Sequence, residues 1–509
     1  MEKKRIVLII GGGIAGLSTA YSLLKENPSY KPIIIEQEDV VGGLSRTINY
    51  DGNLIDIGPH RFFSKEERVM DFWKSFLPMQ GSGARDDLAL GRDFNFDGSS
   101  DPESEEKSML KRRRYSRIYY SKKFFDYPVK MNLKTVLNLG IFKTAICGFS
   151  YIKSCFYKRK ENSLEDFMIN RFGKVLYRIF FEFYTQKVWG RHPKDISKEW
   201  GAQRIKGLSL MKALLNKLSF KKETSLIEEY IYPKYGASQL WDEMAKEILR
   251  MGGEIHTNSK VIGLNLENNR ITSITVRTPK GEFEYHGEYV VSSMPIRDLI
   301  SSLSCVPQER CLAISQDLPY RDYILVSHLL KDLKLKNNTE WPTTNNICPD
   351  SWIYVQDREV SVGRLYIPKN FSPYISNNDN EILLGMEYFC NENDEFWNKS
   401  EEEAFEYSID ELLKLGAIKD RSDILKSYRL KVKDAYPAYF DSYKDFDEIK
   451  DFINKIENLY CVGRNGQHKY NNMDHSTLCG ILTAEAIINQ SPKELLWNVN
   501  TEQDYQETK

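Results

Sequence analysis

The sequence predicts an α/β fold that begins with a parallel sheet, and three adjoining features of its first 36 residues support this prediction. An apolar run, RIVLII, occupies residues 5–10 and has the composition of a buried strand. A glycine-rich turn follows at residues 11–16, and an apolar stretch to Leu24 then indicates a helix. A second apolar run at residues 33–35, closed by Glu36, completes a strand–turn–helix–strand unit.

The glycines of this turn have the spacing that a dinucleotide pyrophosphate requires. Gly11 permits the tight turn, Gly13 lets phosphate approach the backbone, and Gly16 lets the helix lie against the strand. The helix starts with Ile14 and Ala15, and its free N–H groups and dipole favour bound phosphate. We therefore expect dinucleotide binding, the alternative being a glycine-rich turn in an unrelated α/β protein.

The residues that follow favour FAD over NAD. Glu36 lies twenty residues beyond Gly16, where a carboxylate can accept hydrogen bonds from a ribose. A second glycine pair leads through Gly43 and Leu44 to Arg46, which can neutralise a diphosphate. This extension is typical of FAD-binding chains. No basic residue adjoins Glu36, which argues against a ribose 2′-phosphate.

Length, charge and cysteine content restrict the class of protein. The 509 residues predict two or three domains, and a net charge of −1 argues against attraction of the chain as a whole to nucleic acid or to a membrane. The eight cysteines are scattered without metal-type spacing, so we expect reduced thiols, no metal site and a cytoplasmic protein. The first strand begins within five residues of the N-terminus, so we expect no signal peptide.

The strand and helix patterns predict a sheet that two insertions interrupt. A hairpin is expected at 117–130, helices from 132 to about 220, and short strands at 255–291. A second, antiparallel sheet is expected from strands at 320–330, 352–356, 362–367 and 382–389. The resulting domains are an FAD-binding domain (1–76, 230–303 and 457–490), a helical insertion (77–229), a substrate domain with the antiparallel sheet (304–456) and a C-terminal tail (491–509).

Two stretches have unusual composition. Residues 79–117 are rich in Gly, Asp, Ser, Glu and Arg, so we expect an exposed insertion whose basic run, 111–114, lies in a solvated loop. An anion site is the alternative for this run. Residues 135–152 form the most apolar long stretch, but Asn138 and Lys143 interrupt it. This pattern argues against a transmembrane segment and is compatible with a surface-associated helical patch.

Three separated motifs are more specific than the glycine turn. Residues 58–63 read GPHRFF, residues 184–190 read YTQKVWG, and residues 463–474 read GRNGQHKYNNMD. In this order they resemble motifs of the UDP-galactopyranose mutase family, within the amine oxidase and protoporphyrinogen oxidase superfamily. The resemblance implies a Rossmann-like FAD-binding domain of the GR2 type, with an inserted helical domain and an antiparallel β-sheet substrate domain.

The resemblance also implies a role for each matching residue. Trp189 would lie near a sugar, Arg204 and Arg364 would hold its diphosphate, and Tyr470 would offer that diphosphate a hydroxyl. His60 would contact the cofactor from the turn beside the flavin. The residues expected at the cofactor are Gly11, Gly13, Ile14, Ala15, Gly16, Glu36, Gly43, Leu44, Arg46, Gly58, Pro59, His60, Val261, Gly463, Arg464, Asn472, Met473, Asp474 and Ser476.

The chemistry that the resemblance implies explains these residue types. N5 of reduced FAD would attack the anomeric carbon of a nucleotide-diphosphate sugar and displace the diphosphate. The sugar ring would then open and reclose, and the diphosphate would return, without net oxidation. Permanently charged guanidinium groups suit a diphosphate that leaves and returns. The implied setting is cell-surface polysaccharide biosynthesis by a homo-oligomer, with NAD(P)H as one candidate reductant.

The sequence also departs from the family pattern, and two other functions stay open. Residues 205–209 have no counterpart of the aromatic loop that clamps uridine, Phe396-Trp397 replace a tyrosine pair, and His468 replaces a tyrosine. The sugar and the nucleotide therefore stay unassigned. The first alternative is an FAD-dependent oxidoreductase acting on an amine or an apolar substrate. The second is a flavin-binding protein without catalysis.

Overall fold

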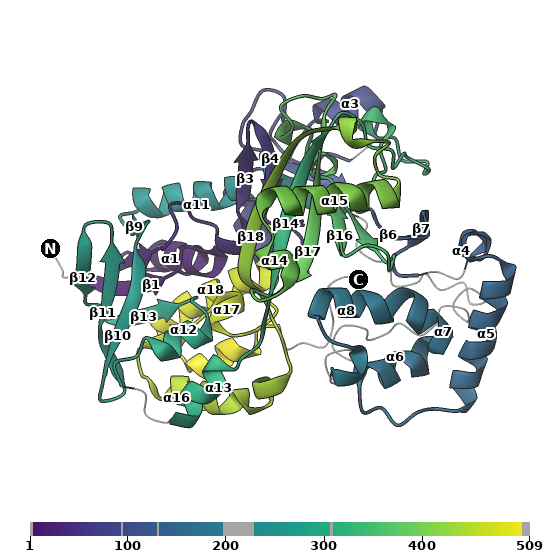
Figure 1. Ribbon diagram of the computed structural model, residues 1–509. Helices are drawn as coiled ribbons and strands as arrows, with labels where there is room; N and C mark the ends of the chain where they lie inside the picture. Colours follow the sequence, from purple (N-terminus) through teal and green to yellow (C-terminus); the bar gives the residue numbers. More distant parts are fainter. Residues whose placement is uncertain (1–3, 93–94, 130–131, 197–228, 306–308, 501–509) are drawn as a thin grey trace.

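The computed structural model describes residues 4–92, 95–129, 132–196, 229–305 and 309–500, and it confirms the α/β fold (Figure 1). The chain begins with the predicted unit, which consists of β1 (Arg5–Ile10), α1 (Ile14–Glu26) and β2 (Tyr30–Ile35). β1 and β2 are parallel, with Ile10 opposite Ile35. The glycine-rich turn therefore lies at the carboxyl end of the sheet, where α/β proteins bind their ligands.

Three downstream strands complete this parallel sheet in the order β19-β13-β1-β2-β9. They are β9 (Glu254–His256), β13 (Tyr289–Ser292) and β19 (Leu459–Cys461), as the interrupted layout predicts. Alternate residues of β1 belong to different clusters of the core, Val7 and Ile9 to one and Leu8 and Ile10 to another. Both faces of the sheet are thus covered, which explains why its strands read as continuous apolar runs.

Helices and a small meander provide the two covering layers. The Val7 cluster includes residues of α1, of α2 (Glu67–Lys74), of α11 (Ser238–Arg250) and of α18 (Met473–Asn489). The Leu8 cluster includes the meander β10 (Lys260–Glu267), β11 (Arg270–Thr278) and β12 (Gly281–Tyr285). It also takes in α12 (Ile296–Ser301), α13 (Glu309–Gln316) and α16 (Phe446–Lys455).

The second large sheet has seven strands in the order β18-β14-β17-β16-β15-β6-β7. The strands are β6 (Ser116–Tyr120), β7 (Lys123–Asp126), β14 (Tyr320–Leu330), β15 (Trp352–Val355), β16 (Arg364–Tyr366), β17 (Ile382–Cys390) and β18 (Ile424–Pro437). The β15–β6 pair is parallel, so this sheet is mixed and not antiparallel throughout. The predicted hairpin at 117–130 forms, and it joins this sheet.

Shorter elements surround the second sheet. α14 (Glu395–Asn398) and α15 (Glu401–Leu415) follow β17, and Ser400 and Glu403 form a capping box at the start of α15. The hairpin of β3 (Thr47–Tyr50) and β4 (Asn53–Asp56) leads into the turn at residues 58–63. Leu496 and Trp497, in the 3-10 helix η9 (Lys493–Asn498), are buried, so part of the predicted tail packs on the core.

The expectation of a solvated loop for the basic run at 111–114 is wrong. This run lies in and directly after β5 (Met109–Arg113), which pairs with β8 (Glu229–Pro233), and the preceding insertion contains α3 (Arg85–Leu90). Arg112 is 3% exposed, and its Nη1 donates to Asp87 Oδ2 at 2.8 Å. Alternate residues of a strand point to opposite sides, so one arginine of the run faces the interior, where an acidic partner neutralises it.

A group of helices projects from one side of the molecule (Figure 1). It comprises α4 (Leu133–Leu139), α5 (Ile141–Phe156), α6 (Leu164–Phe172), α7 (Lys174–Tyr177), the π-helical turn η2 (Arg178–Glu182) and α8 (Phe183–Trp189). Ser163 caps α6 by accepting from the Asp166 N–H at 3.3 Å. Residues 197–228, with the predicted ligand Arg204, lie outside the described residues.

The described helices are short or only partly apolar. None of them alone has the length and apolar composition to cross a membrane. α4 and α5 have that length and composition only when they are taken together, and the chain bends by 110° between them.

Candidate functional site

The glycine-rich turn contacts the second glycine pair. Gly13 forms a parallel bridge with Gly42, and a Cβ on Gly43 would lie 3.2 Å from Gly13 Cα. Gly11 has a φ of +101°, and a Cβ on Gly16 would lie only 2.1 Å from Gly11 O. A Cβ on Gly13 would meet nothing nearer than 3.9 Å. Gly11 and Gly16 are therefore required by the fold itself, whereas Gly13 leaves room that a pyrophosphate can use.

Glu36 is fixed beside this turn by the backbone. Its Oε2 accepts from the Gly12 N–H at 2.6 Å and its Oε1 from the Glu38 N–H at 2.9 Å. Burial raises the pKa of Glu36, and these two hydrogen bonds oppose that rise. Each carboxylate oxygen keeps acceptor capacity for a ribose hydroxyl. Among the described residues, none forms a hydrogen bond with the buried Nε of Arg46, which suits a nearby anion.

The carboxyl-terminal motif lies against the start of α1. Gly463 begins α17 (Gly463–Gly466), and a Cβ there would lie 3.0 Å from Ala15 Cβ. The predicted residues Asn472, Met473, Asp474 and Ser476 form the N-cap and first turn of α18. This close approach and the room beside Gly13 fit an FAD molecule. The N-termini of the helices and the nearby glycines would hold its diphosphate. Val261 lies buried in β10, and its contact with the cofactor stays a prediction.

The turn at residues 58–63 sits against the second sheet. Gly58 has a φ of +76°, and a Cβ there would lie 3.2 Å from Glu387 Oε1. Pro59 follows, and His60 Nδ1 lies 3.8 Å from Asp56 Oδ2, with no hydrogen bond to any of the described residues. The cofactor contact of His60 stays a prediction.

Arg364 forms the centre of the candidate site. It begins β16 and stands directly across from Glu387 of β17. Its Nη2 donates to Glu387 Oε1 at 3.1 Å and to Tyr436 Oη at 2.9 Å, and its Nε donates to the other carboxylate oxygen. Glu387 is completely buried, and this burial raises its pKa while the guanidinium opposes the rise. Protein groups therefore fix the position of Arg364, and Glu387 already neutralises its charge.

Aromatic contacts connect this arginine to the other predicted residues. The ring centroids of Tyr436 and Tyr470 lie 5.5 Å apart in a stacked arrangement, and those of Trp189 and Tyr470 lie 6.5 Å apart. The Arg464 guanidinium carbon lies 4.8 Å from the Tyr470 ring, and Arg464 Nε donates to the Asn471 carbonyl at 2.9 Å. Arg364, Arg464, Trp189 and Tyr470 therefore form one cluster, although Trp189 and Tyr470 are 281 positions apart in the chain.

Sequence reasoning missed three groups that position this cluster. Glu387 is the single acidic residue in the apolar strand ILLGMEYFC, and this isolated charge is a signal that could have identified it. Tyr436 carried no signal of its own. Lys187 donates from Nζ to the carbonyls of Val355, Asp357 and Val362 at 3.1, 2.8 and 3.1 Å. Burial lowers the pKa of Lys187 to about 8, and its three bonds tie α8 to the chain around β15 and β16.

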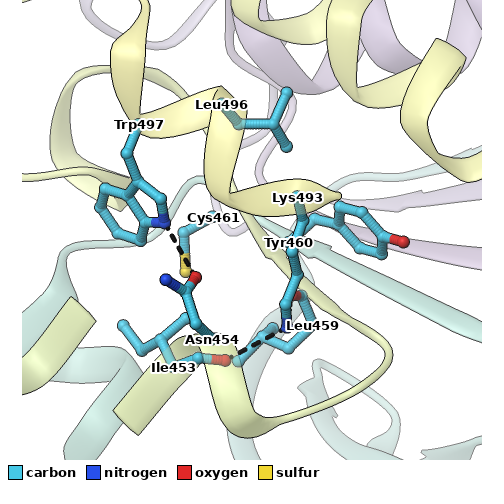
Figure 2. A pocket seen from close by; sticks show the side chains of 8 residues that line it. All are labelled: Ile453, Asn454, Leu459, Tyr460, Cys461, Lys493, Leu496 and Trp497. Carbon is cyan, nitrogen blue, oxygen red and sulfur yellow. Dashed lines mark hydrogen bonds between the residues drawn. The ribbon is translucent and has the colours of Figure 1, made fainter. Parts of the chain in front are cut away.

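Other polar and hollow regions do not contribute to the cluster. His468 is buried, its Nε2 donates to the Ala438 carbonyl at 3.1 Å, and burial lowers its pKa to about 4, which indicates a packing role. A narrow gap between α16, β19 and η9 is too small to hold a water molecule (Figure 2). Its lining residues are Ile453, Asn454, Leu459, Tyr460, Cys461, Lys493, Leu496 and Trp497, none of which was predicted for the site.

Comparison with known proteins agrees with this arrangement. The family described as flavin containing amine oxidoreductase matches residues 14–488. A crystal structure of reduced UDP-galactopyranose mutase superposes with a TM-score of 0.76 at 19% identity, covering 99% of this chain and 100% of that chain. A putative protoporphyrinogen oxidase from Exiguobacterium sp. 255-15 gives a TM-score of 0.67 at 15% identity, covering 96% of this chain and 100% of that chain.

Sequence relatives point to the same superfamily. A 4,4′-diapophytoene desaturase (4,4′-diapolycopene-forming) from Methylomonas sp. is 25% identical over 292 residues, which cover 53% of this chain and 50% of the desaturase. The chain thus spans about half the length of this curated relative. A coproporphyrinogen III oxidase from Staphylococcus aureus is 37% identical over 68 residues, which cover 13% of this chain and 15% of that oxidase.

Proposed function

The chain belongs to the family of flavin-containing amine oxidoreductases, with FAD as its cofactor, and from this premise we propose that it is an FAD-dependent nucleotide-sugar mutase. Its reaction would interconvert the pyranose and furanose rings of a nucleotide-diphosphate sugar, without net oxidation. The proposed role of this reaction is in cell-surface polysaccharide biosynthesis. That the protein forms a homo-oligomer stays a prediction.

The observation that carries this proposal is the convergence of Arg364, Trp189 and Tyr470 on one cluster. An ordinary oxidase of apolar molecules has no need for a buried guanidinium beside its aromatic walls. A diphosphate leaving group does need one, because a planar, permanently charged fork binds phosphate oxygens well and keeps the anion close.

The contacts of Arg364 leave one nitrogen for that anion. Nε and Nη2 are engaged by Glu387 and Tyr436, and no hydrogen bond to Nη1 is formed by the described residues. Glu387 thus fixes the plane of the guanidinium, and Nη1 would donate to a diphosphate oxygen. Trp189 would present a flat face to the sugar and Tyr470 a hydroxyl to the diphosphate. Bound reduced FAD would supply the nucleophile, and Arg204 stays a predicted second guanidinium.

A second candidate function is a net oxidation of the desaturase or oxidase type. The similarity to a diapophytoene desaturase and to a coproporphyrinogen III oxidase favours it. Such a reaction consumes an electron acceptor in proportion to product, whereas the mutase reaction consumes none.

Incubation of the flavin-loaded protein with a panel of nucleotide sugars distinguishes the two candidates. With dithionite present, the mutase proposal expects a ring isomer of one sugar nucleotide to separate on chromatography, and it expects no isomer from the air-oxidised protein. Acceptor consumption that matches product, with no isomer from any sugar, would instead establish the oxidoreductase.

A further inference from the structure

The helix α5 turns its large apolar side chains away from the protein. Phe142, Phe149 and Phe156 recur every seven residues and are 87%, 76% and 80% exposed. Together with Ile141, Ile146 and Ile152, each at least half exposed, they form what we call the apolar face of α5. Figure 1 places α5 at the outer edge of the helical group. An exposed apolar surface of this extent marks an interaction site.

The opposite side of α5 carries small and polar side chains, and it packs closely against α6 and α7. Cys147 and Ser154 are buried, and Ser150 Oγ accepts from the Val175 N–H at 3.1 Å. A Cβ on Gly173, between α6 and α7, would lie 2.7 Å from the Tyr151 backbone nitrogen. The orientation of α5 is thus set by close packing, with its large apolar residues on the outside.

The charged residues in the chain segment that contains α5 all have one sign. Residues 127–160 contain seven Lys or Arg and no Asp or Glu. Lys143 and Lys153 lie on α5 itself and are exposed, and Lys134 lies on α4. No carboxylate in the described ranges forms an ion pair with any of these three lysines. An apolar helical face flanked by lysines is the pattern of helices that lie in the interface of an anionic membrane.

We propose that the apolar face of α5 docks this protein onto an anionic lipid bilayer, with the helix lying in the plane of the membrane surface. The phenylalanine and isoleucine side chains would enter the boundary between headgroups and acyl chains, and Lys143 and Lys153 would contact lipid phosphates. α5 has 16 residues, so its length of about 24 Å is shorter than the hydrocarbon core of about 30 Å. The helix therefore lies on the bilayer and does not cross it.

The charge pattern favours a membrane over a second copy of the chain. A two-fold symmetric dimer would bring this face against itself and place the lysines of both copies together, with no acidic residue of 127–160 to neutralise them. Anionic lipid supplies the missing negative charge. Leu133 and Leu137 of α4, which are 74% and 66% exposed, add apolar surface immediately before α5.

Sedimentation of the flavin-loaded full chain with vesicles tests the proposal. We expect binding to vesicles of phosphatidylcholine mixed with phosphatidylglycerol, weaker binding to phosphatidylcholine alone, and a decrease at high salt. The double variant F142S/F149S should bind at least about tenfold more weakly, because two exposed phenylalanines no longer enter the lipid. The matched control is L88S, which removes an apolar side chain that is 66% exposed on α3.

Three results would overturn the proposal. The first is no binding to anionic vesicles, and the second is binding that F142S/F149S and L88S change equally. The third is a dimer of the lipid-free protein, detected by analytical ultracentrifugation, that F142S/F149S dissociates. Flavin absorbance and thermal unfolding of each variant should match those of the wild type, because these side chains are exposed. K143E/K153E should reduce binding chiefly at low salt, which separates the electrostatic contribution from the apolar one.

Discussion

Arg364 and Glu387 stand directly opposite each other on β16 and β17, and their side chains form an ion pair whose carboxylate is completely buried. Residues directly opposite on antiparallel strands have Cβ atoms about 5 Å apart, so the sheet register alone brings these two charges together. Arg364 consequently has two roles, as a counter-charge in the fold and as the proposed ligand of a diphosphate. The two roles can be separated by experiment.

Replacement of Arg364 alone should reduce both stability and turnover. R364M leaves Glu387 buried without a counter-ion, so we expect the free energy of unfolding at pH 7 to fall by about 3–5 kcal/mol. The double variant R364M/E387M removes both charges and should recover most of that loss, but it should not recover isomerase turnover. Urea unfolding and the chromatographic assay measure the two effects, and the flavin-to-protein ratio should stay unchanged. Normal turnover in R364M would refute the proposed role.

The glycine turn gives a second prediction, on cofactor binding. G13A should fold normally, because its Cβ meets nothing within 3.9 Å, but it should retain little FAD since the methyl group occupies the room beside the turn. G16A is the contrasting variant. Its Cβ would lie 2.1 Å from the Gly11 carbonyl oxygen, so we expect a loss of folded protein. Circular dichroism and the absorbance of bound flavin distinguish the outcomes. Full flavin content in G13A would show that the diphosphate lies elsewhere.

The first layer of the fold could be predicted because its signals are local. The run RIVLII, the glycine spacing and Glu36 lie within 36 residues, and each has one physical interpretation. The parallel sheet and α1 match that prediction in position and type. Helix and strand types farther along the chain were also predicted, because their periodicities are clear.

The composition of the second sheet and the partner of Arg364 could not be predicted in the same way. The parallel contact of β6 with β15 joins residues more than 230 positions apart, and no local pattern encodes that pairing. Glu387 and Tyr436 become neighbours of Arg364 only through strand register. Motif resemblance brought Trp189, Arg364, Arg464 and Tyr470 to attention, but it said nothing of the carboxylate that engages two of the guanidinium nitrogens.

The buried arginine of β5 supplies a third prediction. R112A should reduce the free energy of unfolding by about 2–3 kcal/mol, because the buried Asp87 would lose the donor that contacts it at 2.8 Å and keep, of its arginine contacts, only Arg92 Nη1 at 3.2 Å. The neighbouring Arg113 is exposed and provides the matched control, for which we expect a loss of at most about 1 kcal/mol. Urea unfolding of both variants at pH 7 tests this difference. Equal losses would mean that the strand does not orient these two side chains oppositely.

The pH dependence of stability gives the last prediction, through the buried imidazole of His328. Its ring nitrogens lie 2.8 Å from Ser427 Oγ and 2.7 Å from Ser408 Oγ, and the residue is completely buried in β14. Burial lowers the pKa of His328 from 6.5 to about 4, because the charged ring would lose its hydration. Between these pH values the unfolded chain binds a proton that the folded chain does not bind.

The free energy of unfolding should therefore be unaffected by His328 above pH 6.5 and should fall as the pH drops towards 4. A shift of this size corresponds to about 3 kcal/mol over the window. H328N cannot bind that proton, so it should show a flatter decline between pH 6.5 and 4 even if it is less stable at pH 7. The exposed His286 provides the control variant H286N. An identical decline in H328N and the wild type would show that His328 is already protonated in the folded protein.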